Sequence, residues 1–409
     1  MVLLPYPIRL PALTDSQITR VGFKSPEDVV VVSAVRTALT KGRKGGFKDV
    51  LADELLSTVL RATIERTGID PGVVQDICVG NVAGKGGLAT PARMAALHAG
   101  FPESTSVSTV NRQCSSGLQA CVQIASAIQT GLIEIGIGAG VESMTHDYFS
   151  RKVTVSERIA KDVAAAEDCK LPMGITSENV ATEYGITRTE QDAFSVESHR
   201  KAAAAQQAGL FQDEIVPVTV KTEEGQTVVV DQDEGIRPKS TVEGLSRLKP
   251  AFSPTGSTTA GNASQISDGA AAVLLMKRKT AQKLGLVILG KYVTAVSVGV
   301  PPRVMGVGPA YAIPVALERA GLRLEDVDLF EINEAFASQA LYTIKALQIP
   351  PEKVNPKGGA IAIGHPLGCT GARQVATLFP ELKRTNKNIG VSSMCIGSGM
   401  GMAAVWERE

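Results

Sequence analysis

Residues 106–129 read SVSTVNRQCSSGLQACVQIASAIQ, with Cys114 near the middle. Valine alternates with Ser and Thr over residues 106–110, which predicts a short strand. From Leu118 onward apolar residues recur at helical spacing and predict a helix to about Gln129. Cys114 therefore falls on a tight turn between a strand and the positive end of a helix. The helix dipole stabilises negative charge there, so the position favours a nucleophilic thiolate.

A packed core position is the alternative for Cys114, because free cysteines most often behave as small buried hydrophobes. The turn alone leaves the two interpretations about equally supported. The chain has six cysteines and no CxxC pair, which indicates a reducing compartment. The residues expected around Cys114 decide between the two interpretations.

The composition excludes several classes of protein. The 409 residues are enough for two or three domains with ample core. Lys and Arg number 42 against 41 Asp and Glu, so no global charge recruits nucleic acid or an anionic membrane. No apolar run approaches the ~18 residues that span a bilayer. We therefore expect a soluble globular protein.

Two halves of the chain repeat one plan. A predicted strand ends at Asn81 in the first half and at Asn333 in the second. Cys114 follows Asn81 at nearly the same distance along the chain as His365 follows Asn333. A helix-like segment and a Gly-rich apolar strand come next in each half. The matching segments are 76–80, 118–129 and 133–138 in the first half, and 328–332, 372–383 and 389–394 in the second.

Alternating strands and helices predict an α/β fold, and a duplication places equivalent loops face to face across a pseudo-twofold axis. Cys114 and His365 then become opposite members of one site. An Ala-rich helical stretch and short charged strands interrupt the repeat, as an inserted lid or ligand-binding wall would. The expected divisions are an extension (1–27), an N-terminal half (28–145, completed by about 265–287), an inserted loop domain (146–264) and a C-terminal half (288–409).

Few other side chains could carry chemistry. Only four histidines exist, and His365 lies between glycines, where a substrate can approach closely. His199 lies in a polar helical run and is expected to be exposed. Cys395 belongs to a Gly-rich run whose backbone N–H groups could bind an oxyanion; a packed glycine hairpin is the alternative. His365 and Cys369 could suggest a metal pair, but no other ligand spacing supports a metal site.

Sequence motifs typical of other enzyme chemistries are absent. The Gly-rich segments have neither Walker nor dinucleotide spacing, and neither HExxH nor GxSxG occurs. Two Gly-flanked cysteines with a Gly-flanked histidine instead suggest acyl transfer through a thioester, with the second thiol moving a proton.

Four blocks resemble the signatures of the thiolase family. They read NRQCSSG (111–117), NEAFA (333–337), GHPLG (364–368) and CIGSG (395–399), in family order and with family-like spacing. The resemblance runs from about Asp28 to Trp406. It implies an acyltransferase built from two duplicated α/β/α halves in a five-layer sandwich with an inserted loop domain. It implies no cofactor, because coenzyme A is a substrate.

The resemblance also implies five catalytic residues. Cys114 would take the acyl group. His365 would activate it and polarise the keto oxygen, with a water held by Asn333. Cys395 would move a proton to and from the acetyl-CoA carbon. The N–H groups of Cys114 and Gly397 would bind the oxygen of the acyl-enzyme.

The same resemblance implies a substrate site. Arg237 matches an adenine-stacking arginine and Ser264 a serine that contacts the pantetheine arm. Met173 and Met305 match residues of the acyl pocket, where soft side chains suit a flexible ligand. Further candidates for substrate contact are Phe252, Ala260, Ala335 and Phe336.

Two details bear on the subtype. The order Gln113-Cys114-Ser115-Ser116 is similar to degradative 3-ketoacyl-CoA thiolases, and Pro172 stands where many short-chain members have His. The expected reaction is thiolysis of 3-ketoacyl-CoA by CoA, giving acetyl-CoA and a shortened acyl-CoA in fatty-acid β-oxidation. The alternatives are an acetoacetyl-CoA thiolase that runs in the condensing direction and an inactive lipid-carrier or scaffold protein. A homodimer is expected, with no nucleic acid and no membrane span.

The peroxisome is the expected compartment, with the cytoplasm as the alternative. Peroxisomal thiolases often carry an Arg-Leu-x5-His/Gln-Leu signal near the start. Here Arg9-Leu10 is followed by Gln17 one position late, and the chain ends Trp406-Glu407-Arg408-Glu409, not Ser-Lys-Leu. The compartment is therefore expected from the catalytic blocks.

Overall fold

A computed structural model describes residues 21–148, 154–222 and 225–409. Most of the expected extension, including the segment with Arg9-Leu10 and Gln17, lies outside the described residues. Among the helices that are described, none is long and apolar enough to cross a membrane.

The N-terminal sheet has the strand order β1-β9-β5-β3-β4. β9 runs antiparallel to β1 and β5, while β3 is parallel to β5 and β4. Short β2 and β6 pair with β9 and β1. The strands are β1 Val29–Thr37, β2 Thr40–Lys41, β3 Asp76–Gly80, β4 Ser106–Val110, β5 Ile135–Ser143, β6 Ile215–Val216 and β9 Ser267–Lys277. The helices of this half are α1 Ala52–Thr67, α2 Ala89–His98, α3 Ser116–Gln129 and, after β9, α9 Arg278–Lys283.

The C-terminal sheet repeats this topology. Its order is β10-β13-β12-β11, with β13 antiparallel to β10 and β12 and β11 parallel to β12. Val354 forms a parallel bridge to Phe330 of β11, in the place that β4 takes in the other sheet. The strands are β10 Gly290–Gly299, β11 Leu329–Ile332, β12 Ile389–Ile396 and β13 Met400–Arg408. The helices are α10 Gly308–Ala320, α11 Ala337–Leu347, α12 Ala360–Ile363 and α13 Thr370–Arg384. The duplicated α/β plan expected from the sequence is confirmed.

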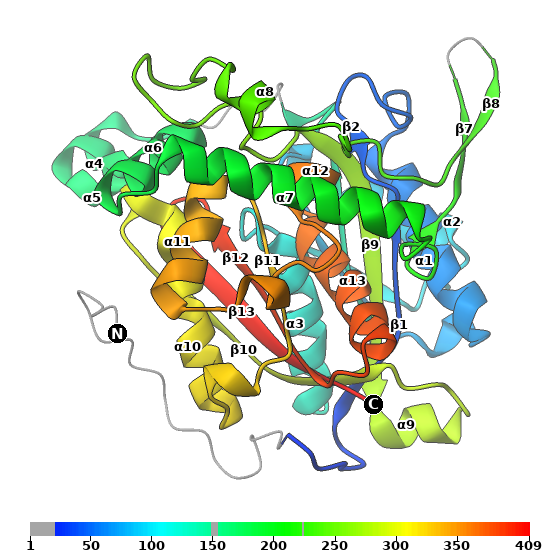
Figure 1. Ribbon diagram of the computed structural model, residues 1–409. Helices are drawn as coiled ribbons and strands as arrows, with labels where there is room; N and C mark the ends of the chain where they lie inside the picture. The colour runs from blue at the N-terminus through cyan, green and yellow to red at the C-terminus, as the bar shows by residue number, and fades with distance from the viewer. Residues whose placement is uncertain (1–20, 149–153, 223–224) are drawn as a thin grey trace.

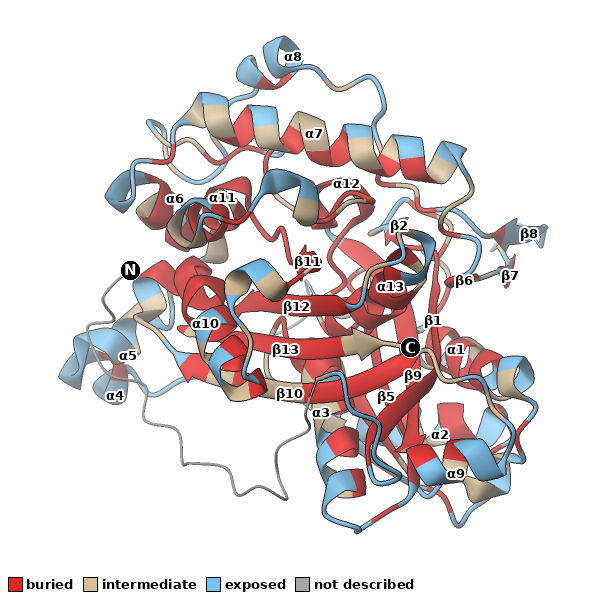
Figure 2. Ribbon diagram, turned by 60° about the horizontal axis from the view of Figure 1, so that its bottom comes forward, coloured by how far each residue is buried: buried red, intermediate tan, exposed pale blue. Residues whose placement is uncertain are grey.

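Helices α3 and α13 lie between the two sheets (Figure 1) and share one buried apolar cluster with strands of both. α1 and α2 cover the outer face of the first sheet, and α10 and α11 that of the second. The result is five layers whose strands are almost wholly buried (Figure 2). The sheets join edge to edge where Val30 and Val31 pair with Lys291 and Gly290.

The two central helices touch through backbone. A Cβ on Gly117, in the first turn of α3, would lie 2.6 Å from the carbonyl oxygen of Gly368. A Cβ on Gly371, in the first turn of α13, would overlap the backbone nitrogen of Leu118. Only glycine allows this approach. The loops that precede the two helices, with Cys114 and His365, are therefore brought against each other.

The insertion lies over the ends of both halves, with α7 running across the top of the molecule in Figure 1. Thr187 and Glu190 form a capping box that starts α7, so the helix begins before the Ala-rich stretch of the sequence. The described elements are α4 Glu157–Asp162, α5 Ala164–Asp168, α6 Met173–Glu183, α7 Arg188–Gln207, β7 Val218–Lys221, β8 Thr227–Val230 and α8 Val242–Ser246.

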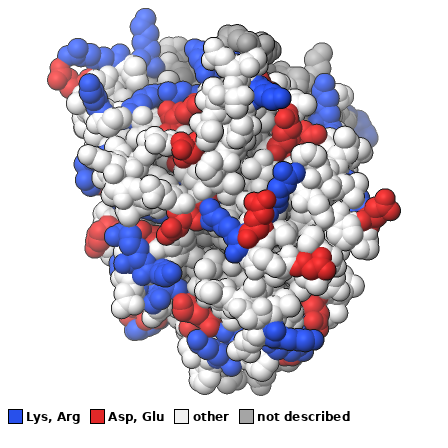
Figure 3. Space-filling view, turned by 90° about the vertical axis from the view of Figure 1, so that its right-hand side faces the viewer, with Lys and Arg blue, Asp and Glu red and all other residues white. Residues whose placement is uncertain are grey.

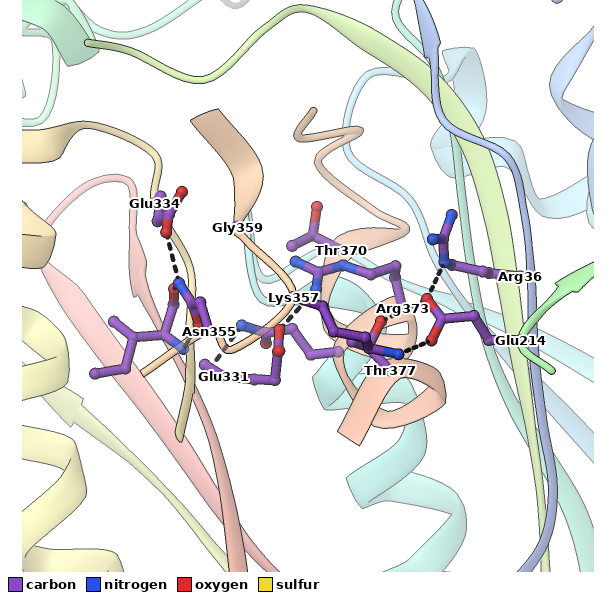
Figure 4. Close-up of polar contacts among 12 residues, drawn as sticks. Arg36, Glu214, Glu331, Glu334, Asn355, Lys357, Gly359, Thr370, Arg373 and Thr377 are labelled. Atoms are coloured by element: carbon purple, nitrogen blue, oxygen red, sulfur yellow. Dashed lines mark hydrogen bonds and ion pairs between the residues drawn. The ribbon is translucent and has the colours of Figure 1, made fainter. Parts of the chain in front are cut away.

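A buried charged network ties the insertion to the layers (Figure 4). Arg36 of β1 pairs with Glu214 at 2.7 Å and with Asp233 at 2.7 Å. Glu214 also accepts hydrogen bonds from Lys357 at 2.7 Å and from the hydroxyl of Thr377, on α13, at 3.0 Å. Every charge has a partner, as buried ionic groups require.

Candidate active site

The turn that carries Cys114 is formed as the sequence predicts. β4 ends at Val110 and α3 begins at Ser116. The Ser116 hydroxyl donates to the carbonyl of Gln113 at 2.6 Å and accepts from the backbone N–H of Arg112 at 2.9 Å. Gln113 has φ 48°, a sparsely populated conformation for a residue with a side chain. Such backbone conformations cluster at functional sites, and this one presents Cys114 with 9% exposure.

His365 lies on the opposite loop, after Gly364 at φ 109°. Its Nδ1 is 2.6 Å from the Thr370 hydroxyl and its Nε2 is 3.3 Å from Nδ2 of Asn333. Burial lowers the pKa of His365 to about 3, and the nearby charge of Arg373 acts in the same direction. The imidazole is therefore neutral at physiological pH and can act as a base.

Asn333 follows β11 and is fully buried. Its backbone N–H donates to Ser393 of β12 at 2.9 Å, and its carbonyl accepts from the amide of Gln339 at 2.8 Å. Within the described chain its Oδ1 has no hydrogen-bond partner. A buried amide oxygen of this kind is suited to hold a water molecule beside His365.

Cys395 is the second thiol of the site. Burial raises its pKa well above the ordinary value, and the charge of Cys114 adds to the shift, so the two sulfurs share one environment. Gly397, just beyond β12, lies beside Gln113 and Met173: a Cβ on it would be 3.7 Å from the Gln113 Cγ and 3.5 Å from the Met173 Sδ. The two predicted oxyanion donors, on Cys114 and Gly397, thus belong to neighbouring loops.

The residues expected at the acyl wall surround Cys395. They form one apolar cluster composed of Met305, Ala335, Phe336 and Cys395, with Met173 and Ala263 packed against it. Phe252, 43% exposed, meets Phe336 edge to face with ring centroids 6.4 Å apart. The backbone N–H of Ser264 donates to the carbonyl of Ala335 at 2.9 Å. Ala260, also a candidate, is exposed beyond this cluster.

Arg237 has an exposed side chain, as a residue that stacks on a ligand base requires. Its backbone N–H donates to Nδ1 of His199 at 3.2 Å. His199 has 2% exposure, so the expectation of an exposed His199 is wrong. The reason is that α7 buries a polar face against the rest of the protein; its members are Gln191, Asp192, Ser195, Ser198 and His199.

Three supporting residues were missed by sequence reasoning: Glu142, Gln265 and Thr370. Glu142 accepts from the N–H groups of Val82 at 3.0 Å and Gly368 at 2.8 Å, and so joins loops of both halves. Gln265 donates to the carbonyl of Gly235 at 2.9 Å, while its own carbonyl accepts from the backbone N–H of His365 at 3.2 Å. No local pattern marks the contacts of Glu142 and Gln265, because their partners are far apart in sequence. Thr370 is only five residues from His365, but its position at a helix start does not reveal the contact.

The arrangement combines two thiols, one neutral imidazole and a buried amide next to an apolar cluster. A thiol can carry an acyl group, and an adjacent base and a second thiol can move the protons. Among the residues described, no group of three or more His, Cys, Asp or Glu side chains could hold a metal ion.

Comparison with known proteins identifies the family. The model "Thiolase, N-terminal domain" matches residues 29–279, and "Thiolase, C-terminal domain" matches residues 286–408. The peroxisomal 3-ketoacyl-CoA thiolase 1 of Petunia hybrida is 58% identical over 392 residues, which cover 93% of this chain and 84% of that protein.

Solved structures of thiolases also match this chain. The crystal structure of the dimeric peroxisomal thiolase of Saccharomyces cerevisiae matches with a TM-score of 0.90 and 51% identity, over 95% of this chain and 99% of that one. A second structure, of the peroxisomal 3-ketoacyl-CoA thiolase of the same organism, matches with a TM-score of 0.79 and 47% identity, over 94% and 99% of the chains. That structure is described as five-layered and built from two core domains of identical topology, which confirms the expected fold. The chain belongs to the thiolase family.

Proposed function

We propose that this chain is a 3-ketoacyl-CoA thiolase that cleaves 3-ketoacyl-CoA with CoA to acetyl-CoA and an acyl-CoA two carbons shorter. The observation that carries the proposal is the convergence of Cys114, His365, Asn333 and Cys395 from equivalent loops of both halves into one buried site. The 58% identity to a peroxisomal 3-ketoacyl-CoA thiolase supports the same substrate.

In the first half-reaction the sulfur of Cys114 attacks the keto carbon while its proton passes to Nε2 of His365. The keto oxygen gains negative charge. It is stabilised by His365 and by the water molecule that Asn333 is suited to hold. The bond between the keto carbon and its neighbour then breaks, and the electron pair stays on the acetyl-CoA carbon. Cys395 gives that carbon a proton, so acetyl-CoA leaves and the acyl group remains on Cys114 as a thioester.

In the second half-reaction CoA attacks the thioester. The Cys395 thiolate takes the proton of the CoA thiol, which regenerates the thiol lost in the first step. The acyl group moves to CoA, and the sulfur of Cys114 recovers a proton from His365. Gly397 lies beside Gln113, the neighbour of Cys114, and we expect the N–H groups of Cys114 and Gly397 to stabilise the thioester oxygen.

The test is product analysis with purified protein. Incubation with CoA and 3-ketoacyl-CoA of increasing chain length should give acetyl-CoA and the shortened acyl-CoA in equal amounts. Cleavage confined to acetoacetyl-CoA, with efficient condensation of acetyl-CoA, would instead support the condensing alternative. Absence of turnover with every length would support the scaffold alternative, which the four assembled polar groups disfavour.

The chain is 58% identical to a thiolase of the peroxisome, and the peroxisome is its compartment. A fluorescent fusion of the full-length chain should coincide with a peroxisomal marker. A fusion of residues 1–25 alone tests whether the segment with Arg9-Leu10 is the address. Diffuse fluorescence of the full-length fusion would contradict this localisation.

A homodimer is supported by the edge of the N-terminal sheet. β4 pairs with β3 on one side only and is partly exposed, and α2 beside it presents Met94 and Leu97 to solvent. An unpaired edge next to apolar side chains is suited to pair with a second copy. Charges of both signs are interspersed on the face shown in Figure 3, which offers no single-sign surface for another class of partner.

The dimer prediction is checked by light scattering at micromolar concentration. The expected mass is twice the 42.9 kDa of the chain. Asp in place of Val107, on the edge strand, should shift the mass toward one chain. A mass of one chain for the unchanged protein would refute the dimer.

A further inference from the structure

Thr370, the first residue of α13, is fully buried beside His365. Its hydroxyl oxygen contacts two groups. It lies 3.0 Å from the carbonyl oxygen of Pro366 and 2.6 Å from Nδ1 of His365. The Pro366 carbonyl also accepts the backbone N–H of Thr370 at 3.0 Å, which fixes the residue relative to the loop.

These contacts determine where the protons lie. A hydroxyl has one hydrogen, and both contacts of Thr370 are hydrogen bonds only if that hydrogen points to the Pro366 carbonyl, which cannot donate. The hydroxyl oxygen therefore faces Nδ1 with a lone pair, so Nδ1 must carry a hydrogen. On the other side of the ring, Nδ2 of Asn333 donates to Nε2 at 3.3 Å, which requires a bare Nε2. With this orientation of the Asn333 amide, both contacts are hydrogen bonds in the Nδ1–H form of a neutral ring.

We propose that Thr370 is a positioning residue that holds His365 in the Nδ1–H tautomer. Nε2 then stays unprotonated, in long contact with Asn333 at 3.3 Å, and can exchange that contact for the proton of Cys114. The inference rests on the proposed thiolase function for its catalytic consequence, and on the hydrogen bonds alone for the tautomer. When Nε2 takes the proton from the Cys114 sulfur, the ring becomes an imidazolium. Its Nδ1–H still donates to Thr370, while its new Nε2–H can donate to the substrate oxygen.

Without the hydroxyl, the Nδ1–H would be buried with no acceptor. An unsatisfied buried donor is unfavourable, so the ring would shift to the Nε2–H form. The Asn333 side chain would then rotate so that its Oδ1 accepts the Nε2–H. That form presents a hydrogen to Cys114 where the reaction needs a lone pair. The acylation step should therefore slow, while the binding of CoA, which uses other residues, should not change.

The test compares Thr370→Val, which removes the hydroxyl at nearly constant shape, with Thr370→Ser, which keeps it. We expect the Val variant to lose about 10- to 100-fold in kcat, as for other residues that orient a reacting histidine, with little change in KM for CoA. The Ser variant should recover most of that loss. A Ser variant as slow as the Val variant would overturn the proposal.

Thr377→Val is the matched control, since Thr377 is also a buried threonine of α13 but donates to Glu214 and not to the histidine. Alkylation of Cys114 by iodoacetamide, followed by mass spectrometry across pH, reports how readily its proton is removed. Thr370→Val should shift this profile to higher pH, and Thr377→Val should leave it unchanged even if both variants melt earlier. Equal profiles for the two variants would overturn the proposal.

The tautomer itself can be read from nitrogen NMR of protein labelled only in histidine, with His365→Asn to assign the signal. The unliganded enzyme should show a protonated Nδ1 and a bare Nε2, and Thr370→Val should show the reverse. A bare Nδ1 in the unchanged protein would overturn the proposal. Because this measurement needs no substrate, it remains decisive if the proposed thiolysis is not observed.

Discussion

Glu142 connects the loop after β3 to the loop that follows His365. It is a fully buried carboxylate whose oxygens accept from Val82 and Ala83 in one half and from Gly368, next to the histidine loop, in the other. Burial raises the pKa of this carboxyl to about 7, and the same N–H groups oppose that shift. The ionised form is the one that all these donors need.

Glu142→Gln should therefore destabilise the protein. The new NH2 group would face backbone donors, and at least one N–H would lose its acceptor, which costs about 2–4 kcal/mol. Chemical denaturation with an unchanged m-value checks the prediction. Glu65→Gln, an exposed change on α1, is the control and should stay within about 0.5 kcal/mol of the original. Equal stabilities for both variants would contradict the role given to Glu142.

Cys395→Ala should separate the two half-reactions. The variant keeps Cys114 and His365, so a preformed acyl-CoA should still load Cys114, as mass spectrometry can show. Cleavage of the carbon–carbon bond needs the proton of Cys395 and should fall by about 10²–10⁴-fold. Label on a different cysteine, or cleavage at the original rate, would refute the assignment. Cys114→Ser, in contrast, should abolish both steps.

Helix α7 contacts both the segment that leads to His365 and the segment that carries Arg237. The hydroxyl of Ser198 donates to Glu334 at 2.7 Å and accepts from the backbone N–H of Gly359 at 3.1 Å, just before α12. The next residue, His199, accepts the backbone N–H of Arg237. Adjacent side chains of one helix thus hold the segment before α12 and the arginine expected at the adenine.

His199→Phe should weaken recognition of the nucleotide without changing the chemistry. The backbone N–H of Arg237 would lose its buried acceptor, and its segment would be displaced. We expect KM for CoA to rise by about tenfold, which corresponds to roughly 1.4 kcal/mol, with kcat nearly unchanged. A 3-ketoacyl thioester of N-acetylcysteamine has no nucleotide and serves as the control, since its turnover should be unaffected. An equal loss with both substrates would contradict this role.

Periodicity predicted the elements well where one face is apolar. β4, α3 and the Gly-rich strands β5 and β12 follow from alternation and helical spacing, and the duplication follows from matched segments. The polar buried face of α7 could not be seen this way, because a polar run predicts an exposed helix. The role of Thr370 was also invisible, since a Thr at a helix start is usually only a cap. Predicting it requires knowing that His365 turns back onto the same helix.

Buried ionisable groups give the whole molecule opposing responses to pH. Burial lowers the pKa of His199 to about 4 and of His365 to about 3, so between these values and 6.5 the unfolded chain binds protons that the folded protein does not. These histidines therefore make the protein less stable as pH falls. Burial raises the pKa of Glu142 and Glu331 to about 7, and between 7 and 4.5 the folded protein binds the extra protons, which stabilises it as pH falls.

Removing His199 should shift this balance in a measurable direction. As pH falls from 6.5 to 4.5, the free energy of unfolding of His199→Phe should rise relative to that of the original protein. The expected slope is about 1.4 kcal/mol per pH unit, the effect of one proton. Denaturation series at several pH values check the slope, whatever the stability at pH 7. Parallel curves for the two proteins would mean that His199 is protonated in the folded state.

The glycine contacts between α3 and α13 also bear on how the molecule opens. Local unfolding reaches last the parts with the most buried and interlocked backbone, and here these are the helices that begin at the two reactive loops. Amide hydrogens of Cys121 and Val375, one turn further along these helices and fully buried, should accordingly be among the slowest to exchange with deuterium. Many enzymes place their reactive groups on mobile loops, whereas Cys114 and His365, the proposed reactive residues, lie next to helices that we expect to open last. We therefore expect the movement that admits a long acyl chain to come from the insertion, where Ile159 of α4 and Val163, between α4 and α5, are exposed to solvent.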